Sequence, residues 1–521
     1  MLNTNRASFQ IFGNNISDEA KNQLYTALKL PISTQGALMP DAHSGYGLPI
    51  GGVLAVENAV IPYGVGMDIG CRMSLSILDT PVSYLDGARD KYEKALAEHT
   101  KFGMYETHKS HVEHEIFDRD TFDMIPILRR LKGKAIKQMG TSGGGNHFVE
   151  FGEVEIIEED EQIGLPKGKY LGILSHSGSR GLGAEIAQYY SRVAAEQCPL
   201  PKEAQQFAWL DLSTHLGLEY WTAMNLAGDY ASACHDDIHR RLVKAVGGRV
   251  KSRIENHHNF AWKEIHNGKE VIVHRKGATP ANENELGMIP GSMTAKGFIV
   301  RGKGNPDSLN SASHGAGRAH SRGECRSLFI QNDIKKELKL KNVTLMGGNA
   351  EEAPMAYKDI NEVMNAQSDL VDILGTFQPR ITWLGSICWT GKSTFRKLHK
   401  RSNWFIGVFE LEGFPFAIGE QETFDCKIKG KGPGTKYHSA SEKNAGNVEQ
   451  SFADNYPYSL PECLEALNYA LSYDPEDADS LCLMGRIYSE MLSDYEKAKL
   501  YFEEAMQYPY FRRKEEALPM L

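Results

Sequence analysis

The sequence predicts an α+β protein, in which a mixed α/β domain is followed by a small α-helical segment. Three observations lead to this fold class. Short apolar runs such as 53–56 and 171–174 alternate with glycine-rich turns, as strands joined by tight connections do. Longer stretches at 203–226 and 359–374 have helical character. From about residue 461 the pattern is helical alone.

Length and composition indicate an ordinary globular protein. The 521 residues, 41% hydrophobic and 24% charged, can bury a sizeable core and are expected to form more than one domain. The net charge of -9 argues against a protein that coats nucleic acid over its whole surface, although it allows a local basic cleft. Because no run of eighteen apolar residues and no signal-like N-terminus occurs, we expect no membrane association and a cytoplasmic location.

We divide the chain into three parts. Residues 1–385 carry all the glycine-rich motif segments and form the expected main domain. Residues 386–455 are interpreted as an extension and a linker, because a glycine- and lysine-rich stretch at 427–435 leads into polar sequence. Segment 385–393 ends in Gly-Lys-Ser, but its glycines are not spaced as in a phosphate loop, so we discount it.

Residues 456–521 form the third part, a helical segment. Its pattern resembles a tetratricopeptide repeat with one extra residue in the turn between its helices. The positions that carry this resemblance are Leu481, Met484, Gly485, Tyr488, Ala498, Phe502 and Ala505, with Cys463, Leu467, Ala470 and Pro475 fitting the second helix of a preceding repeat. A plain helical hairpin is the alternative, since about one and a half repeats are too few for a self-standing solenoid.

The segment Ala312-Ser-His-Gly-Ala-Gly-Arg318 indicates covalent phosphoryl chemistry. It places His314 between small residues and beside an arginine. Neutral imidazole attacks phosphorus readily, and the phosphoramidate that forms is reactive enough to pass the group on. A tight turn with a structural histidine is the alternative. Cationic side chains that could clamp phosphates lie in or beside the motifs: Arg180, Arg275, Lys276, Arg301, Lys303, Arg318 and Arg322.

A second group of residues suggests a metal site. Asp68 and Cys71 place a carboxylate and a thiol three residues apart on a glycine-flanked turn. Histidines in distinctive local contexts are His147, His176, His258 and His314. Three of these with the acid and the thiol would supply enough ligands for two divalent ions, with the thiolate able to bridge. The mixture suits manganese, zinc or iron better than magnesium.

Several motifs together resemble the RtcB-type RNA ligases, over roughly residues 35 to 385. The segments that carry this resemblance are Met39-Pro-Asp-Ala-His43, Gly66-Met-Asp-Ile-Gly-Cys71, Gly143-Gly-Gly-Asn-His-Phe-Val-Glu150, His176-Ser-Gly-Ser-Arg180, His257-His-Asn259, Pro290-Gly-Ser-Met293, Ser313-His-Gly-Ala-Gly-Arg318 and Glu352-Ala-Pro-Met-Ala-Tyr-Lys358. The resemblance implies joining of RNA 3'-phosphate or 2',3'-cyclic phosphate ends to 5'-hydroxyl ends, with GTP and two manganese ions, in RNA repair or tRNA splicing. It also implies an archease-like activator as a possible partner, beside a protein partner for the tail.

The resemblance assigns a role to each site residue. It implies that Asp68, Cys71, His147, His176 and His258 bind metal, and that His314 forms the histidine-GMP intermediate. The guanylate pocket would comprise Asn146, His147, Phe148, Val149, Glu150, His258, Asn259, Pro290, Gly291, Ser292, Met293, His314, Gly315, Ala316 and Gly317. RNA or phosphate would be bound by Arg180, Arg318 and Arg322. Glu150 could accept hydrogen bonds from N1–H and the exocyclic amine of guanine.

Two positions depart from the family pattern, and both fall in the nucleotide site. Gly297 stands where the family usually has a serine, and Leu384 stands where it has a lysine near the end of the catalytic chain. Loss of a charged donor weakens binding by about 1.5 to 3 kcal/mol unless another residue such as Lys392 substitutes. These departures keep two alternatives open: a cyclic phosphodiesterase or 3'-end guanylyltransferase without joining, and a non-catalytic adaptor that binds RNA ends.

Overall fold

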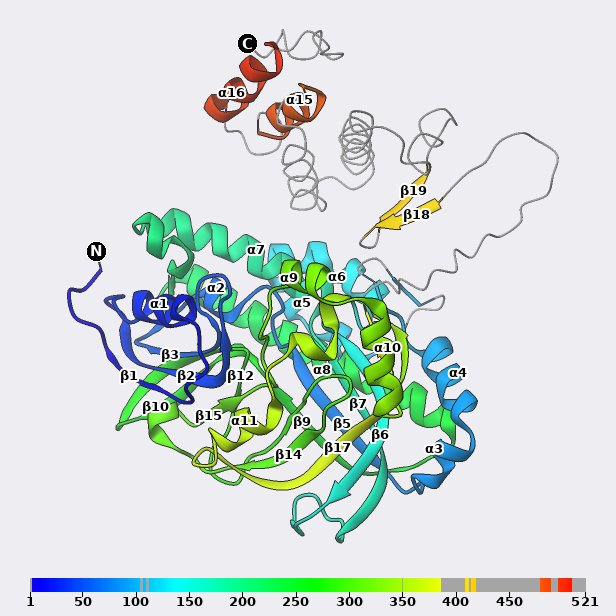
Figure 1. The fold of residues 1–521 in the computed structure, drawn as a ribbon. Helices are drawn as coiled ribbons and strands as arrows, with labels where there is room; N and C mark the ends of the chain where they lie inside the picture. Colours follow the sequence, from blue (N-terminus) through cyan, green and yellow to red (C-terminus); the bar gives the residue numbers. More distant parts are fainter. Residues whose placement is uncertain are drawn as a thin grey trace, which may run out of the picture. The chain divides into compact units, whose positions relative to one another are not determined.

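The protein is described by a computed structural model that covers residues 2–103, 106–108, 112–348, 350–385, 408–411, 414–417, 478–488 and 495–507. The chain divides into two units, residues 1–393 and residues 394–521, and each is described by itself. Strand-rich sheets and packed helices in the first unit confirm the predicted α+β class (Figure 1). No helix in the described ranges is both long and apolar enough to cross a membrane.

The centre of the first unit is a sheet of eight strands. Its order is β13-β14-β17-β6-β7-β5-β9, with β16 paired to β17. The strands are β5 (Arg72–Leu78), β6 (Phe148–Ile156), β7 (Gly168–Ser177), β9 (Val250–His257), β13 (Leu286–Ile289), β14 (Gly297–Gly302), β16 (Thr344–Gly347) and β17 (Val371–Leu384). The predicted strand at 171–174 lies within β7. One face of the sheet carries an apolar cluster drawn from seven of these strands, including Leu75, Val154 and Phe377.

A second sheet of five strands adjoins the first. Its order is β1-β2-β3-β11-β10, and the predicted strand at 53–56 lies within β3. The strands are β1 (Ser8–Ile11), β2 (Ser33–His43), β3 (Ile50–Val56), β10 (Asn259–His266) and β11 (Lys269–Lys276). Two small sheets pair β4 (Ala59–Val60) with β8 (Leu210–Asp211), and β12 (Ala278–Pro280) with β15 (Ser311–Ser313). Only His258 separates β9 from β10, so this residue lies at the junction of the two large sheets.

Helices cover the outer face of the eight-stranded sheet. Ile238 and Leu242 of α8 pack with Val149 and Phe151 of β6 in one buried cluster. The helices of this unit are α1 (Asp18–Ala27), α2 (Pro62–Val65), α3 (Ser83–Gly87), α4 (Arg89–His99), α5 (Thr121–Met124), α6 (Pro126–Gln138), α7 (Arg180–Gln197), α8 (His215–Val246), α9 (Arg322–Leu328), α10 (Gln331–Leu340) and α11 (Ile360–Asn365). Short 3-10 turns occupy Glu115–Asp118, Lys202–Phe207, Pro306–Ser308, Ala350–Glu352 and Pro354–Ala356. Because Val149 faces the helices, its neighbours Phe148 and Glu150 face the opposite side.

The predicted helix at 203–226 is wrong in its first half. Lys202–Phe207 forms a 3-10 helix and Leu210–Asp211 a short strand, and α8 begins only at His215. Thr214 caps α8, because its side chain accepts a hydrogen bond from the Gly217 N–H at 3.1 Å. The helix then continues twenty residues beyond the predicted end, to Val246, because one face stays buried along its length.

The predicted helix at 359–374 is wrong in its second half. Asp359 caps α11, which ends at Asn365. The chain enters β17 at Val371, where residues 371–373 pair with β14, and the pairing of β17 with β6 begins at Gly375. Pairing with a strand distant in the sequence therefore overrides the local helical preference of this stretch.

Replacing Thr214 by alanine should lower the free energy of unfolding by about 1 kcal/mol, because the cap of a long, buried helix is lost. Urea denaturation followed by tryptophan fluorescence measures the loss. Thr222→Ala is the matched control, since Thr222 is exposed on the same helix and bonds only the Leu218 carbonyl. Equal stabilities of the two variants would contradict the capping role.

In the second unit, the described helices are α15 (Ala478–Arg486) and α16 (Tyr495–Ala505). They pack through a small apolar cluster that contains Leu481, Cys482, Ala498, Phe502 and Ala505. A Cβ at Gly485 would lie 2.8 Å from the Phe502 ring, so the contact needs a glycine there. β18 (Val408–Leu411) and β19 (Phe414–Ala417) form a hairpin. The half repeat predicted around Cys463 to Pro475, Lys392 and the rest of the expected linker lie outside the described residues.

Candidate functional site

The antiparallel register brings several strand ends together at one edge of the eight-stranded sheet. β5 begins at Arg72, which lies opposite His257 at the end of β9. β6 begins at Phe148, which lies opposite His176 on β7 and opposite Leu384 at the end of β17. Residues at or next to these ends therefore meet although they are far apart in the sequence. They include Cys71, His147, His176 and His258.

Cys71 is shared by two sets of potential metal-donor atoms. Its Sγ lies 3.5 Å from His147 Nε2 and 3.2 Å from His176 Nε2. His147 Nε2 is 2.8 Å from Asp68 Oδ2, and His176 Nε2 is 3.2 Å from His258 Nε2. The donor atoms of Cys71, His147 and His176 all lie within 4.8 Å of one another. The structure thus brings together all five side chains that the sequence analysis selected as metal ligands.

Two histidines of this cluster, His176 and His258, are held in the neutral form that binds metal. Burial lowers the pKa of His176 to about 3 and keeps the pKa of His258 well below its usual value. The Nδ1–H groups of His147 and His176 donate to the carbonyl oxygens of Ser142, at 2.7 Å, and Asn146, at 3.0 Å. Each Nε2 lone pair is therefore directed into the cluster. A cation placed among these converging lone pairs relieves their mutual repulsion.

The Cys71 thiol and the Asp68 carboxylate add a soft sulfur donor and a hard oxygen donor to the histidine nitrogens. Burial and the neighbouring Asp68 carboxylate raise the pKa of Cys71 well above its usual value. Binding of a metal to this sulfur must therefore release the thiol proton. Imidazole, thiolate and carboxylate together favour a divalent transition metal over magnesium, so the residues fit the kind of ion that the sequence predicts.

His314 is oriented by a buried carboxylate. Asp41 is fully buried on β2, and its Oδ2 lies 2.7 Å from His314 Nδ1. The same oxygen accepts the backbone N–H groups of His314, at 3.1 Å, and Gly315, at 3.3 Å. Because Nδ1–H points at the carboxylate, the Nε2 lone pair is available for attack. A Cβ on Gly317 would lie 2.0 Å from the Asp41 carbonyl oxygen, so only glycine allows this close approach.

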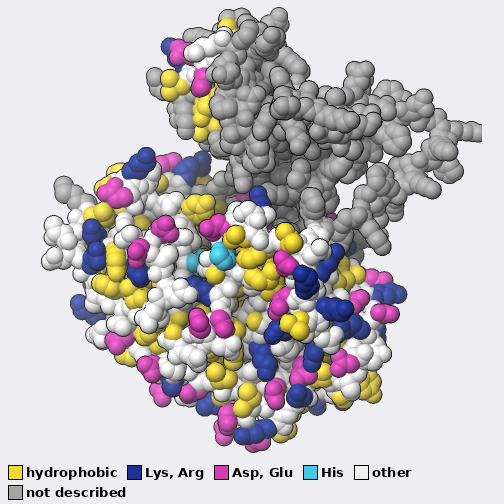
Figure 2. Space-filling model, viewed as in Figure 1, with side chains coloured by type: hydrophobic (Ala, Val, Ile, Leu, Met, Phe, Trp, Pro, Cys, Tyr) yellow, Lys and Arg dark blue, Asp and Glu magenta, His cyan; other side chains and the backbone are white. Residues whose placement is uncertain are grey.

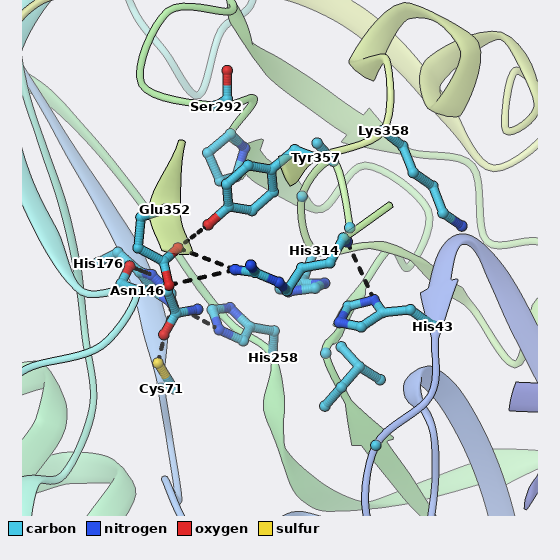
Figure 3. A pocket seen from close by; sticks show the side chains of 18 of the residues that line it. His43, Cys71, Asn146, His176, His258, Ser292, His314, Glu352, Tyr357 and Lys358 are labelled. Carbon is cyan, nitrogen blue, oxygen red and sulfur yellow. Dashed lines mark hydrogen bonds and ion pairs between the residues drawn. The ribbon is translucent and has the colours of Figure 1, made fainter. Parts of the chain in front are cut away.

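A cavity of about 1160 Å³ joins His314 to the donor cluster. Figure 3 shows His258 and His314 lining the same cavity as Cys71 and His176, and the rings of His258 and His314 are 5.0 Å apart. Figure 2 shows histidine side chains exposed at one place on the viewed face of the first unit. The predicted residues that line the cavity are Asp68, Cys71, Asn146, Phe148, Glu150, His176, His258, Asn259, Pro290, Gly291, Ser292, Met293, His314, Gly315, Ala316, Gly317, Arg318 and Arg322.

Three predicted residues do not line this cavity. His147 is buried and contacts Cys71 and Asp68, which do line the cavity. Val149 packs into the apolar cluster on the opposite face of the sheet, so its side chain points away. Arg180 donates to the Thr141 hydroxyl, at 3.3 Å, and to a backbone carbonyl.

The two arginines at the cavity are already paired within the protein. Arg318 donates to both carboxylate oxygens of Glu352 at 3.4 Å and to the Glu351 carbonyl oxygen at 2.6 Å. Arg322 lies 3.5 Å from Glu352 through its Nε and remains half exposed. The Tyr357 hydroxyl also donates to Glu352, as Figure 3 shows. A phosphate that approaches these guanidinium groups would compete with a buried carboxylate.

The comparisons with known proteins fit this arrangement. The family model described as tRNA-splicing ligase RtcB matches residues 23–124 and 119–385. The chain belongs to the RtcB family. It is 33% identical over 410 residues to RNA-splicing ligase RtcB of Escherichia coli strain K12, which covers 73% of this chain and 97% of that protein. It is 29% identical over 427 residues to tRNA-splicing ligase RtcB of Methanococcus maripaludis, which covers 68% of this chain and 88% of that protein.

The two departures from the RtcB pattern occupy tightly packed positions on the cavity wall. Leu384 is buried in an apolar cluster with Met293, Ile334 and Leu338. A Cβ on Gly297 would lie 2.4 Å from the end of the Met288 side chain, so a serine at this position requires local rearrangement.

Sequence reasoning gave no role to several residues of the site. Asp41 and Lys358 lie inside motif segments but were assigned no function, whereas Lys276 was named only among the cations that could clamp phosphates. Asp41 had a usable signal, since it is the one acidic side chain in the apolar run from Ala37 to Ala42. The burial of an unpaired acid is costly, so an acid within a predicted buried strand indicates a specific partner.

Proposed function

We infer that the chain is an RNA ligase of the splicing or repair type, which uses GTP and manganese. Its substrates would be RNA ends that bear a 3'-phosphate or 2',3'-cyclic phosphate and a 5'-hydroxyl. The observation that carries this inference is the His314 imidazole, which Asp41 orients at 2.7 Å and which faces the cavity beside the donor cluster. Family membership and the length of the match support the same reaction.

The proposed reaction has three transfers after a cyclic phosphate has been opened by water. His314 Nε2 forms a bond to the α-phosphorus of GTP, and pyrophosphate leaves with the electron pair of the broken P–O bond. The 3'-phosphate of the RNA then takes the guanylate from the histidine. The 5'-hydroxyl finally attacks the activated 3'-phosphate, and GMP leaves. Asp41 stabilises the positive charge that develops on the imidazole.

The cofactor assignments follow from the donor chemistry. Asp68, Cys71, His147, His176 and His258 would hold two manganese ions, an assignment supported by the short distances among their donor atoms. When bound, the ions would offset charge on the phosphate oxygens. Glu150, Asn259, the 290–293 turn and the 315–317 backbone would contact GTP, and Arg180, Arg318 and Arg322 would contact RNA.

Leu384 favours a second candidate function. An apolar side chain at the cavity wall offers no donor to the nucleotide, so guanylylation could be weak while the donor cluster stays intact. A metal-dependent cyclic phosphodiesterase, or a guanylyltransferase that stops before joining, would fit such a site. The adaptor alternative is less well supported, because a binding protein has no need of the oriented histidine.

We further propose a role for each of the three parts of the chain. Residues 1–385 would form the catalytic domain, 386–455 an extension and linker, and 456–521 a tetratricopeptide-like segment that recruits a protein partner. An archease-like protein would be a candidate activator. The packing of α15 on α16 supports a helical hairpin in this segment.

Incubation of the full chain with manganese and GTP labelled at the α-phosphate tests the proposal. We expect an acid-labile, alkali-stable protein adduct, followed by joining when RNA with a 2',3'-cyclic phosphate and a 5'-hydroxyl is added. An adduct without joining would point to the guanylyltransferase. Hydrolysis of the cyclic phosphate without an adduct would point to the phosphodiesterase.

Replacing Asp41 by asparagine should lower the rate of adduct formation by roughly 10²- to 10⁴-fold, because the carboxylate no longer fixes the tautomer and charge of His314. Single-turnover measurement with labelled GTP gives the rate. Metal content should remain unchanged, since Asp41 contacts none of the five donors in the described structure. An unchanged adduct rate would show that His314 needs no such partner.

A further inference from the structure

Glu150 is a buried carboxyl group that has no charged partner and faces the cavity. It is 3% exposed and lines the cavity wall. Its Oε1 accepts a hydrogen bond from the Thr382 hydroxyl at 2.8 Å. Among the residues that the structure describes in the first unit, no lysine or arginine pairs with it, and Oε2 has no hydrogen-bond partner. Both features leave the carboxyl group free to contact a ligand.

The wall around Glu150 is apolar. Side chains that line this part of the cavity with it are Phe148, Leu174, Met293, Phe377 and Leu384. Strand register places Thr382 opposite Glu150 and Leu384 opposite Phe148, so Leu384 lies diagonally across from Glu150 on the same face of the sheet. A long side chain at position 384 could reach the carboxyl group, whereas leucine adds only apolar surface.

Charged groups elsewhere at the site do not compensate for this burial. Lys276 bonds the carbonyl oxygens of Tyr46 and Tyr63, and Lys358 bonds those of Asn15, Pro40 and Ala42. Arg318 and Arg322 pair with Glu352.

On the strands beside Glu150, the titratable side chains near this point are His176, which is neutral, and Arg380, which pairs with Glu153. Lys296, beside Gly297 of β14, is exposed. Burial raises the pKa of Glu150 to about 8, although the Thr382 hydrogen bond opposes the shift. The carboxyl group is therefore mostly protonated at pH 7.

The two protonation states of a carboxyl group match different purines. A carboxylate accepts two hydrogen bonds, which suits the N1–H and exocyclic N2–H of guanine. A neutral carboxyl group donates one hydrogen bond and accepts another, which suits the N1 acceptor and N6 amine of adenine. A protonated Glu150 therefore matches the N1 and N6 positions of adenine better than the N1–H and N2–H groups of guanine.

We propose that Glu150, beside the apolar Leu384, makes this chain accept ATP as well as GTP for the histidine adduct, with ATP favoured at neutral pH and GTP at alkaline pH. The proposal rests on the proposed function, in which Glu150 contacts the base. With ATP, His314 Nε2 forms the bond to the α-phosphorus, pyrophosphate leaves with the electrons of the P–O bond, and the adduct is histidine-AMP. Glu150 sets base specificity and takes no part in that bond change.

The test is a competition between GTP and ATP, both labelled at the α-phosphate, with the full chain and manganese from pH 6 to pH 9. Groups whose titration changes the rates with GTP and with ATP by the same factor do not affect the ratio of the two initial adduct rates. We expect the GTP-to-ATP ratio to rise about tenfold per pH unit across this range, because the carboxylate and the protonated form change in opposite directions. The separate ATP rate should begin to fall, and the separate GTP rate should level off, near the Glu150 pKa of about 8. Calorimetric binding of non-cleavable GTP and ATP analogues gives a second readout that is independent of adduct formation.

Three variants make the test specific. Glu150→Gln keeps one donor and one acceptor at every pH, so ATP should remain a substrate and the ratio should no longer depend on pH. Leu384→Lys should lower the pKa of Glu150 and shift selection at least tenfold toward GTP at pH 7. Leu384→Met is the matched control of similar size without charge, and its ratio should equal that of the parent chain.

Outcomes separate this inference from the proposed function. A ratio that stays constant from pH 6 to pH 9, or a Glu150→Gln variant that loses both nucleotides equally, would overturn the role of Glu150. Absence of any adduct with either nucleotide would overturn the proposed ligase reaction. In that case the pH dependence of the analogue affinities would still show whether the protonation state of Glu150 selects between adenine and guanine.

Discussion

Replacing His314 by alanine should abolish formation of the nucleotide adduct, with a loss of at least about 10³-fold in rate, because the variant has no nucleophile at this position. His314 Nε2 is the imidazole nitrogen that faces the cavity, while Nδ1 is held by Asp41 at 2.7 Å. Two other histidines that line the cavity, His176 and His258, do not have this orientation. His176 and His258 point their Nε2 atoms at each other, 3.2 Å apart.

The measurement is the rate of label transfer from α-labelled GTP, together with metal content. His314→Ala should bind metal as the parent chain does, since His314 is no member of the donor cluster. His215→Ala is the control for loss of a histidine, because this side chain is 87% exposed at the start of α8. If the His314 variant still forms an adduct or still joins RNA, the nucleophile lies elsewhere and the proposed reaction fails.

How much of the site could be predicted depended on how local its signals are. Asp68 and Cys71 lie in one turn, and each histidine of the cluster stands in a distinctive motif, so residue type and context were enough to select them. The pairing of Asp41 with His314 spans 273 residues, and no local pattern reports such a contact. The two residues meet because β2 and the turn after β15 reach the same cavity.

Strands with a local sequence signal were likewise predicted correctly, whereas boundaries set by distant partners were not. The strands at 53–56 and 171–174 were predicted because continuous apolar runs are typical of buried strands. The start of β17, at 371–374, was mistaken for helix because its strand character comes from pairing with β14, which is distant in the sequence. At residue 214 the sequence did contain a local signal, since a threonine before a long apolar-periodic stretch favours a helix start.

Leu384 illustrates how structure changes the meaning of a sequence difference. From the sequence alone, it is the absence of a lysine in the nucleotide site. In the structure it also belongs to a packed apolar cluster, and it lies diagonally across from a buried acid that has no cation to pair with. In the proposed function, leucine at this position would affect two properties together: the donors available to the nucleotide and, because no cation is added beside the buried acid, the protonation of Glu150.

Replacing Cys71 by alanine should weaken metal binding on the order of 10²-fold or more and abolish adduct formation with it, because both donor sets lose their shared sulfur. His147 Nε2 and His176 Nε2 lie 3.5 Å and 3.2 Å from this atom, so its removal takes a donor away from both histidines. Metal should also raise the melting temperature of the parent chain more than that of the variant.

Substitution with cobalt makes the role of the sulfur visible, because a thiolate ligand gives a charge-transfer band that imidazole and carboxylate do not. We expect the band in the parent chain and in Cys234→Ala, which removes a buried cysteine from α8 far from the donor cluster in sequence, and its loss in Cys71→Ala. A band that persists in Cys71→Ala would place the thiolate elsewhere. If cobalt binds the parent chain and Cys71→Ala equally and neither shows the band, the ions are held by the carboxylate and the imidazoles alone. The metal-binding role of Cys71 would then be wrong, whereas the role of His314 as nucleophile would be unaffected.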